Sequence, residues 1–244
     1  MYETRTDGVK FRGAGGPIQA WISHRLPQDE RRPGIVLLHG RNGVNEPFKD
    51  VAVRFAEEGI VAMAVNYMTH TDDPSDPDAL RTIDGARAYL QSEPDVDAMK
   101  VVLSGYCKGG GLTYLGLASR PGFMAGIAWH GGIRNRELSA AHPEHPGEAA
   151  RNIDVPLLIL HGASDHPVPI AQVYELAGAL NELGKRFELK VYAGTDHAFT
   201  LPGGANYVPE NADDAFREAV LFIRRLFDLP VGTVGPLVRQ PVGA

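Results

Sequence analysis

The sequence predicts an α/β fold in which helices cover both faces of a mostly parallel central sheet. The chain has 244 residues, a length that suits one large domain. Short apolar runs recur between amphipathic segments, which is the pattern of strands buried on both faces by crossover helices. Hydrophobic residues make up 43% and charged residues 22%, which excludes a disordered chain. We therefore expect a single domain over residues 1–244.

Strands and helices are expected to alternate along most of the chain. The segment Ile18–Ser23 alternates apolar and polar residues, so it predicts a half-exposed antiparallel strand that leads into the sheet. Six apolar runs predict the remaining strands: Gly34–Leu38, Ile60–Val65, Val101–Leu103, Gly126–Trp129, Pro156–Leu160 and Phe187–Tyr192. Helical spacing of apolar residues follows most of them, at Phe48–Glu58, Ala79–Gln91, Leu112–Ser119, Ile170–Leu183 and Ala212–Phe227.

Three segments interrupt this alternation. The segment Thr69–Asp78 is acidic and rich in proline. The segment Arg134–Glu148 holds His142 and His145 between prolines, and we expect both histidines to be solvated. Both segments predict surface loops over one end of the sheet, where they would form the walls of a pocket. Residues 228–244 combine three prolines with three glycines, so we expect an extended C-terminal tail.

Charge and cysteine content narrow the class of partner. The formal net charge is −6, which argues against binding to nucleic acid or to an anionic membrane surface. No stretch approaches the roughly 20 apolar residues of a membrane span. The single cysteine and an N-terminus without an apolar run point to the cytoplasm. We expect a small-molecule substrate and a monomer or homodimer.

The segment VVLSGYCKGGG, Val101–Gly111, carries the most specific signal. An apolar strand runs directly into GYCKGG and then into a helix, which is the pattern of a nucleophile elbow with Cys107 in place of serine. Gly105 and Gly109 would let the backbones approach closely at this sharp turn. The N-terminus of the following helix would lower the pKa of the thiol. The alternative is a buried structural cysteine, which the combination of strand, glycine spacing and helix disfavours.

A thiol nucleophile needs a base, and the base needs an acid that orients it. His197 follows the strand FELKVY and is the expected base. Asp165 follows the strand PLLIL and is the expected acid, because both then lie at carboxyl ends of strands beside Cys107. Asp196 is the rival acid, but neighbouring residues rarely point toward each other.

The remaining histidines and glycines give weaker signals. We expect His39, His130 and His161, each at the end of a strand, to be hydrogen-bonded structural residues, whereas His166 could line the site. No metal site is expected, because neither an HExxH motif nor a CxxC pair occurs. No cofactor is expected either, since the first strand is not followed by GxGxxG.

Two backbone N–H groups are candidates for an oxyanion hole. One belongs to Lys108, directly after the nucleophile, and the other to Arg41, in the loop HGRNGVN after the strand GIVLL. The alternative for the second loop is a simple glycine turn that contributes no donor.

The chain resembles the dienelactone hydrolase family, α/β-hydrolases that use a Cys, Asp and His triad. The resemblance covers roughly Pro17–Phe227 and rests on the elbow GYCKGG, the loop segment GVN, the acid segment HGASDHPVP, the base segment GTDHAF with a following NYV, and the closing helix. It implies the α/β-hydrolase fold, with Cys107 as nucleophile, His197 as base and Asp165 as its orienting acid.

Two departures from the family pattern concern the substrate. Gly40 stands where family members that open dienelactone usually have a glutamate that interacts with the resting thiol, so the control of the thiol must differ. Leu201 lies near the place of an arginine that clamps the substrate carboxylate. Arg41 or Arg134 could replace that clamp. We expect substrate contacts from Tyr67, Arg134, Phe199 and Leu201.

These observations predict a hydrolase that cleaves a small ester or lactone through an acyl-cysteine intermediate. The substrate would be uncharged, because the clamping arginine is missing and the segment Thr69–Asp78 adds four aspartates. One alternative is a protein of the same fold that binds a ligand as a sensor or carrier without turnover. Another is an acyl transferase or peptidase that uses the same triad.

Overall fold

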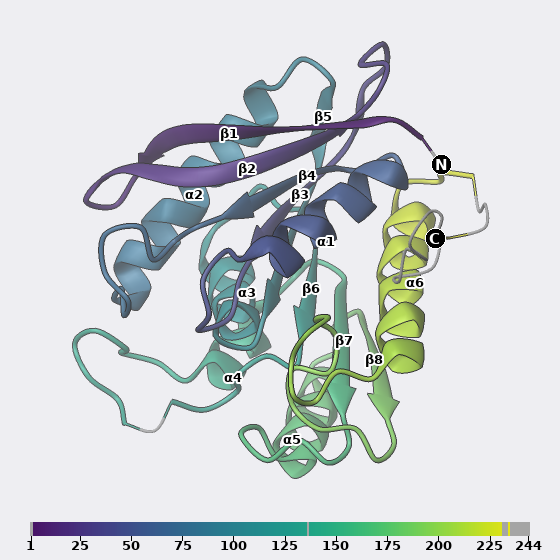
Figure 1. Cartoon of the computed structure of the whole chain (residues 1–244). Coiled ribbons are helices and arrows are strands. Elements are labelled where there is room, and N and C mark those ends of the chain that lie inside the picture. Colours follow the sequence, from purple (N-terminus) through teal and green to yellow (C-terminus); the bar gives the residue numbers. More distant parts are fainter. Residues whose placement is uncertain (1, 136, 231–233, 235–244) are drawn as a thin grey trace.

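The computed structural model describes residues 2–135, 137–230 and 234. Its strands are β1 (Thr4–Gly13), β2 (Gly16–Arg25), β3 (Arg32–Leu38), β4 (Val61–Val65), β5 (Val96–Tyr106), β6 (Ala125–Trp129), β7 (Leu157–Gly162) and β8 (Phe187–Tyr192). Its helices are α1 (Glu46–Glu57), α2 (Asp76–Ser92), α3 (Lys108–Ser119), α4 (Pro146–Ala149), the 3-10 turn η1 (Ala150–Asn152), α5 (Ile170–Glu182) and α6 (Pro209–Leu226). Figure 1 shows the sheet at the centre with helices on both sides.

All eight strands form one sheet in the order β1-β2-β4-β3-β5-β6-β7-β8. The pairs β1–β2 and β2–β4 are antiparallel, and every pair from β4 to β8 is parallel. Because the strands from β3 to β8 run the same way, the loops that follow them meet at one edge of the sheet. This edge is the place expected for a ligand in an open α/β sheet.

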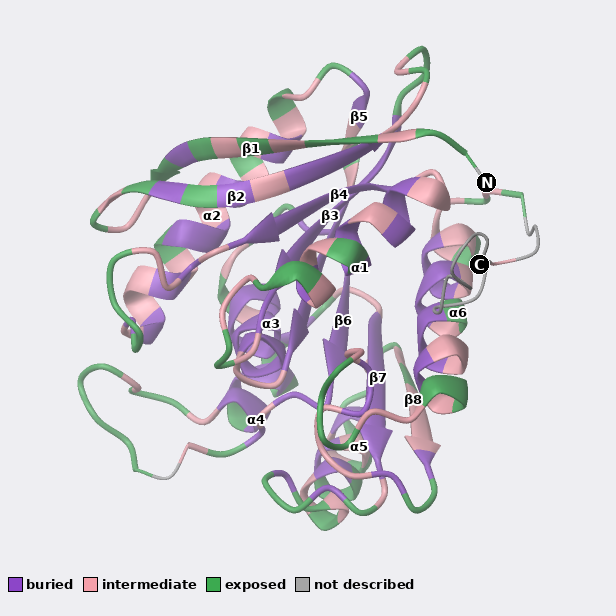
Figure 2. Ribbon diagram, viewed as in Figure 1, coloured by how far each residue is buried: buried purple, intermediate pink, exposed green. Residues whose placement is uncertain are grey.

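The core lies on both faces of the sheet, and side chains alternate between the two. Val36 and Leu38 of β3 pack toward α2, α3 and α5, whereas Ile35 and Leu37 pack toward α1 and α6. Figure 2 shows that the central strands are buried while β1 and β8 are more exposed. Burial on both faces is why the central strands are continuous apolar runs in the sequence.

The predicted strands and helices are all present, with differences at their ends and three additions. β1 was missed because its segment, TRTDGVKFRG, is an exposed edge strand with no apolar run. β5 begins before the predicted Val101, since its first part is half-exposed. The short elements α4 and η1 lie within or beside the predicted loop Arg134–Glu148 and carry no periodic pattern.

The predicted loop Thr69–Asp78 is too long by three residues, because α2 already begins at Asp76. Ser75 caps this helix: its hydroxyl accepts a hydrogen bond from the Asp78 backbone N–H at 3.2 Å. Of the predicted tail, only residues 228–230 and 234 lie within the described part of the chain. None of the helices in that part is long and apolar enough to cross a membrane.

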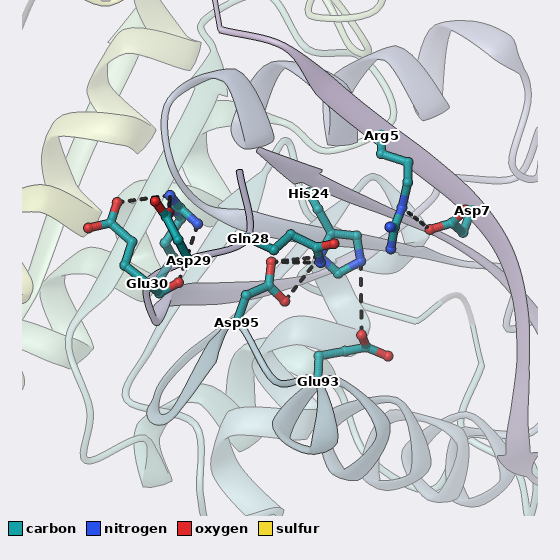
Figure 3. Close-up of polar contacts among 9 residues, drawn as sticks. Arg5, Asp7, His24, Gln28, Asp29, Glu30, Glu93 and Asp95 are labelled. Carbon is teal, nitrogen blue, oxygen red and sulfur yellow. Dashed lines mark hydrogen bonds and ion pairs between the residues drawn. The ribbon is translucent and has the colours of Figure 1, made fainter. Parts of the chain in front are cut away.

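A buried polar cluster ties β2 to the turn before β5, as Figure 3 shows. His24 Nδ1 lies 2.9 Å from Asp95 Oδ2, and Gln28 donates a hydrogen bond to the same carboxylate oxygen at 3.1 Å. On the opposite side of the ring, His24 Nε2 lies 4.0 Å from Glu93 Oε2. His24, Glu93 and Asp95 have the side-chain types of metal ligands, but the two carboxylates face opposite ring nitrogens. This arrangement suits a link between two chain segments better than a single ion site.

Candidate active site

Cys107 occupies a sharp turn between β5 and α3. Its backbone has φ 55° and ψ −114°, in the left-handed region that favours glycine. Three backbone hydrogen bonds hold it there: Cys107 N–H donates to Trp129 O at 3.0 Å, and Cys107 O accepts from Gly111 N–H at 3.1 Å and from Gly132 N–H at 3.2 Å. The turn points the side chain away from β5 at the edge where the strands end.

Two glycines make this turn sterically possible. A Cβ atom at Gly105 would lie 2.1 Å from the carbonyl oxygen of Gly109. A Cβ atom at Gly109 would lie 2.4 Å from the carbonyl oxygen of Leu38, at the end of β3. Both distances are too short for any side chain. The glycine spacing in GYCKGG therefore reflects a close packing of α3 against β5 and β3.

His197 and Asp165 lie in the loops after β8 and β7. Asp165 Oδ2 accepts a hydrogen bond from His197 Nδ1 at 2.7 Å, and Asp165 Oδ1 accepts one from Val168 N–H at 2.7 Å. The carboxylate is buried, and His161 Nε2 lies 3.4 Å from Oδ2. The two loops are packed tightly, because a Cβ at Gly162 would lie 2.3 Å from Thr195 O. Asp165 thus fixes the tautomer of His197 and directs its other nitrogen, Nε2, away from the acid.

Cys107 and His197 shift each other's pKa. Burial raises the pKa of the Cys107 thiol, but interactions with His197, the Lys108 N–H and the Arg41 charge outweigh burial and lower it below its usual range. Burial also opposes the charged form of His197, yet its hydrogen bond to Asp165 and its interaction with Cys107 raise its pKa to about 10. His197 Nε2 is buried without a fully formed hydrogen bond to any described residue. Both shifts favour a thiolate beside an imidazolium.

The N-terminus of α3 adds to this stabilisation of the thiolate. The first turn of the helix contains no acidic residue, so its positive end is not neutralised. The Lys108 backbone N–H, at the start of this helix, contributes to lowering the pKa of the Cys107 thiol. A donor at this position would also face an oxygen that develops negative charge on a carbonyl bound to the sulfur.

Asp196, the rival acid, is engaged elsewhere. Its Oδ1 accepts hydrogen bonds from His197 N–H at 2.6 Å and from His166 N–H at 3.1 Å, while Oδ2 lies 3.0 Å from His166 Nδ1. The His166 side chain is 83% exposed and turned toward Asp196. Asp196 therefore stabilises the turn that carries His197 and does not contact its ring.

The loop after β3 lies directly against Cys107. A Cβ atom at Gly40 would lie 3.2 Å from Cys107 Cβ and 3.9 Å from Sγ, so this position has no room to spare beside the thiol. His39 is buried beneath the loop, with Nδ1 2.5 Å from Gly40 O and its ring stacked on Tyr67 at 4.3 Å. The Tyr67 hydroxyl donates to His39 O at 3.0 Å. Tyr67, expected to contact substrate, is thus a buried support of this loop.

The other three expected substrate contacts are Phe199, Arg134 and Leu201. Phe199 is fully buried and packs against Tyr192 at 5.0 Å, so it belongs to the core. Arg134 is exposed and pairs with Glu175 of α5 at 2.7 Å. Leu201 is partly buried and packs against the same core cluster as Phe199. The expectation that Phe199 contacts substrate was therefore wrong, because an aromatic residue in an apolar run after His197 fills the core instead.

Sequence reasoning missed the contacts that join the two loops over the site. The Lys108 ammonium forms an ion pair with Asp73. Asp76 N–H donates to Ala141 O at 2.8 Å, and His142 Nδ1 lies 2.9 Å from Asp76 Oδ1. His142 and His145 are half-buried rather than solvated, and His145 Nδ1 accepts a hydrogen bond from Asn135 N–H at 3.1 Å. The acidic composition of the first loop was the only signal available for these pairs.

His130 differs from the other histidines at strand ends. Its Nδ1 atom is buried without a hydrogen bond to a described residue, and its ring lies 4.7 Å from the His197 ring. The expected hydrogen bonding is therefore met at Nε2, which lies 3.3 Å from Thr200 Oγ1, and not at Nδ1 among the described residues.

We predict that Gly105→Ala distorts the turn at Cys107, because the new Cβ would overlap the Gly109 carbonyl oxygen. The rate of Cys107 alkylation by iodoacetamide at pH 6 should fall at least about tenfold, the effect of raising the thiol pKa by one unit. Gly178→Ala in α5 is the matched control, since a Cβ there meets nothing within 4 Å. It should leave the rate unchanged. An unchanged rate in Gly105→Ala would contradict the account of the turn.

Comparisons with known proteins agree with this architecture. The model of the dienelactone hydrolase family matches residues 22–227. A protein of Methylorubrum extorquens named "Putative carboxymethylenebutenolidase" is 29% identical over 202 residues, which cover 76% of this chain and 69% of the relative. A Bradyrhizobium protein named "Probable 2-oxo-3-(5-oxofuran-2-ylidene)propanoate lactonase" is 25% identical over 210 residues, which cover 80% of this chain and 84% of the relative.

Solved structures show the same fold. The structure titled "Putative Dienelactone Hydrolase" from Klebsiella pneumoniae superposes with a TM-score of 0.84 at 25% identity, covering 91% of this chain and 99% of that one. Thermogutta terrifontis esterase 2 superposes with a TM-score of 0.77 at 21% identity, covering 93% of this chain and 96% of that one. Because the family model matches residues 22–227 and the whole fold superposes on a solved structure titled as a dienelactone hydrolase, this protein is a member of the dienelactone hydrolase family with the α/β-hydrolase fold.

Proposed function

We propose that this hydrolase cleaves small esters or lactones through an acyl-cysteine intermediate, with Cys107 as nucleophile, His197 as acid and base, and Asp165 as the residue that orients His197. The observation that carries this proposal is the position of His197, hydrogen-bonded to a buried Asp165 on one side and interacting with Cys107 on the other. The carboxymethylenebutenolidase and lactonase names of the relatives support the substrate class.

In the first half of the reaction, the Cys107 thiolate attacks the carbonyl carbon of the substrate. A C–S bond forms, and the electron pair of the C=O double bond moves onto the oxygen. The backbone N–H groups of Lys108 and Arg41 stabilise this oxyanion. When the double bond re-forms, the C–O bond to the leaving group breaks, and the departing oxygen takes the proton from the His197 imidazolium.

In the second half, water cleaves the acyl-cysteine. Neutral His197 takes a proton from the water molecule as its oxygen attacks the carbonyl carbon. The tetrahedral intermediate collapses with breakage of the C–S bond, which releases the acid product. The sulfur leaves as a thiolate and again pairs with the His197 imidazolium. Asp165 remains ionised throughout and stabilises the imidazolium.

Three cations decide whether the site favours an anionic or a neutral substrate. Arg134 pairs with Glu175, and Lys108 pairs with Asp73, so each has a carboxylate of this chain as its partner. Arg41 is exposed and contributes positive charge near the thiol. With two of the three neutralised and Leu201 in the place of a clamping arginine, we infer a preference for neutral esters.

The first prediction from this mechanism concerns the pH dependence of the thiol. The lowered pKa of Cys107 extends the thiolate below the usual thiol range, and the raised pKa of His197 keeps its imidazolium charged up to about pH 10. Alkylation by iodoacetamide should therefore remain fast at pH 6. His197→Ala removes the imidazolium, so the pH at which the alkylation rate rises should move upward. At pH 6 the alkylation rate should fall by at least about tenfold. His166→Ala, on an exposed neighbour, should have no effect, and an ordinary pH profile in the unmodified protein would contradict the activated thiol.

The second prediction separates the two candidate acids. Asp165→Asn should lower kcat for p-nitrophenyl acetate by about a thousandfold or more while the fold is retained, because the His197 ring loses its orienting charge. Asp196→Asn is the matched control and should cost less than about tenfold, since it affects only the backbone of the turn. Circular dichroism would verify folding of both variants. The opposite ranking would assign the acid to Asp196.

The third prediction concerns substrate charge. We expect kcat/KM for p-nitrophenyl butyrate to exceed that for mono-p-nitrophenyl succinate by at least about tenfold, because an unpaired carboxylate pays a desolvation cost. A carboxylate-bearing lactone should be disfavoured for the same reason. Leu201→Arg should reduce the ratio of kcat/KM for the neutral ester to kcat/KM for the anionic ester. Asp73→Asn should reduce this ratio as well, because Lys108 then loses its carboxylate partner.

Leu201→Met, which adds no charge, is the control for Leu201→Arg. An unmodified protein that prefers the anionic ester would show that Arg41 acts as a carboxylate clamp. Burst kinetics would separate turnover from ligand binding alone: tight binding of the esters without an acyl-enzyme would favour a sensor.

A further inference from the structure

His130 lies directly behind His197 at the end of β6. It is 1% exposed, and its backbone has φ 38°, in the left-handed region. The backbone is fixed by a hydrogen bond from His130 N–H to Leu160 O at 2.7 Å. Because the residues on either side of this position also contact the turn at Cys107, the His130 side chain is held against the site from the interior.

The His130 ring is packed edge-to-face on the His197 ring. The ring centroids lie 4.7 Å apart with an interplanar angle of 65°. Tyr106 and Phe199 surround the other sides of His130, with centroids 5.9 Å and 6.1 Å away. The three aromatic contacts leave His130 no room to rotate, so the surface it presents to His197 is rigid.

Hydrogen bonding accounts for only one of the two His130 ring nitrogens among the described residues. Nε2 lies 3.3 Å from Thr200 Oγ1, a long contact, and Nδ1 is buried without a partner among the described residues. A buried polar atom without a partner costs free energy, so the position would be more stable with an apolar aromatic residue if packing alone mattered. What remains is the contact with His197.

The charge state of His130 suits that contact. Burial, and then the charges of His197 and His161, lower its pKa well below the usual value, so the ring stays neutral while His197 is protonated. The groups that face it are His197 from the loop after β8, His161 from β7, Tyr106 from β5 and Thr200. A neutral ring can pack against the imidazolium of His197, whereas a second cation would repel it.

We infer that His130 is a positioning residue: its neutral ring holds the His197 imidazole in the plane that joins Asp165 to Cys107. Asp165 restrains the His197 ring at Nδ1 alone, and packing against its face is needed to limit tilting of the ring. The His130 ring supplies the second restraint, and the imidazole then keeps Nε2 directed at the sulfur. The inference rests on the proposed function, since it assigns a role to His130 through His197.

The test compares two substitutions at position 130. His130→Asn removes the ring, and asparagine tolerates the left-handed backbone. His130→Phe keeps the ring and removes both nitrogens. We expect His130→Asn to lower kcat for p-nitrophenyl acetate by about tenfold to a hundredfold with little change in KM, the cost of misplacing a catalytic group by up to 1 Å. The pH profile of Cys107 alkylation should also move to higher pH. His130→Phe should keep both properties within about threefold of the unmodified protein.

The outcomes distinguish a positioning role from other roles. If His130→Asn lowers Tm but leaves the alkylation profile in place, the residue is merely structural and the inference is wrong. If His130→Phe loses activity and Thr200→Val does too, the nitrogens act through Thr200, and the ring-packing account is also wrong. If His130→Asn does not fold, His130→Leu takes its place as the variant without a ring and is compared with His130→Phe. Cys107→Ala decides the proposed function separately: retained ester cleavage there would overturn the function, whatever His130 does.

Discussion

The left-handed backbone of Cys107 is the constraint on which the site depends. A non-glycine residue in this conformation costs on the order of 1–3 kcal/mol, which the surroundings must offset. Here the offset is the set of backbone hydrogen bonds that Cys107 donates to Trp129 and accepts from Gly111 and Gly132, together with the close packing that Gly105 and Gly109 permit. The same turn aims the positive end of α3 at the sulfur. One local distortion therefore sets both the exposure of the nucleophile and its electrostatic environment.

The charged groups around Cys107 are arranged so that they remain charged although they are buried. Taking a thiolate and an imidazolium out of water is unfavourable for each, and the pKa shifts show that their mutual attraction prevails. Asp165 is buried too, but it accepts hydrogen bonds from both His197 and Val168. Each charge thus has a partner from a different strand end, which is possible because β5, β7 and β8 are parallel and end at the same edge.

The sequence predicts this arrangement well where residue type and backbone geometry are tightly linked. The elbow spacing Gly105, Cys107, Gly109 and the strand-end positions of Asp165 and His197 follow from steric and topological rules, so these side chains were found where expected. β1 was missed because an edge strand needs no apolar run. Phe199 was misplaced because nothing local tells an aromatic side chain to face substrate or the core. The ring contact between His130 and His197 joins residues far apart in the sequence, and no periodic pattern encodes it.

The two loops above the site contact each other, and these contacts affect how the loops can move apart. Asp73 pairs with Lys108, beside the nucleophile, while Asp76 bonds to both Ala141 and His142 of the other loop. A fluctuation that frees either loop must break contacts belonging to the other, so the two form one cooperative unit of local unfolding. Separation of these contacts would then depend on ionic strength, because salt screens their ion pairs.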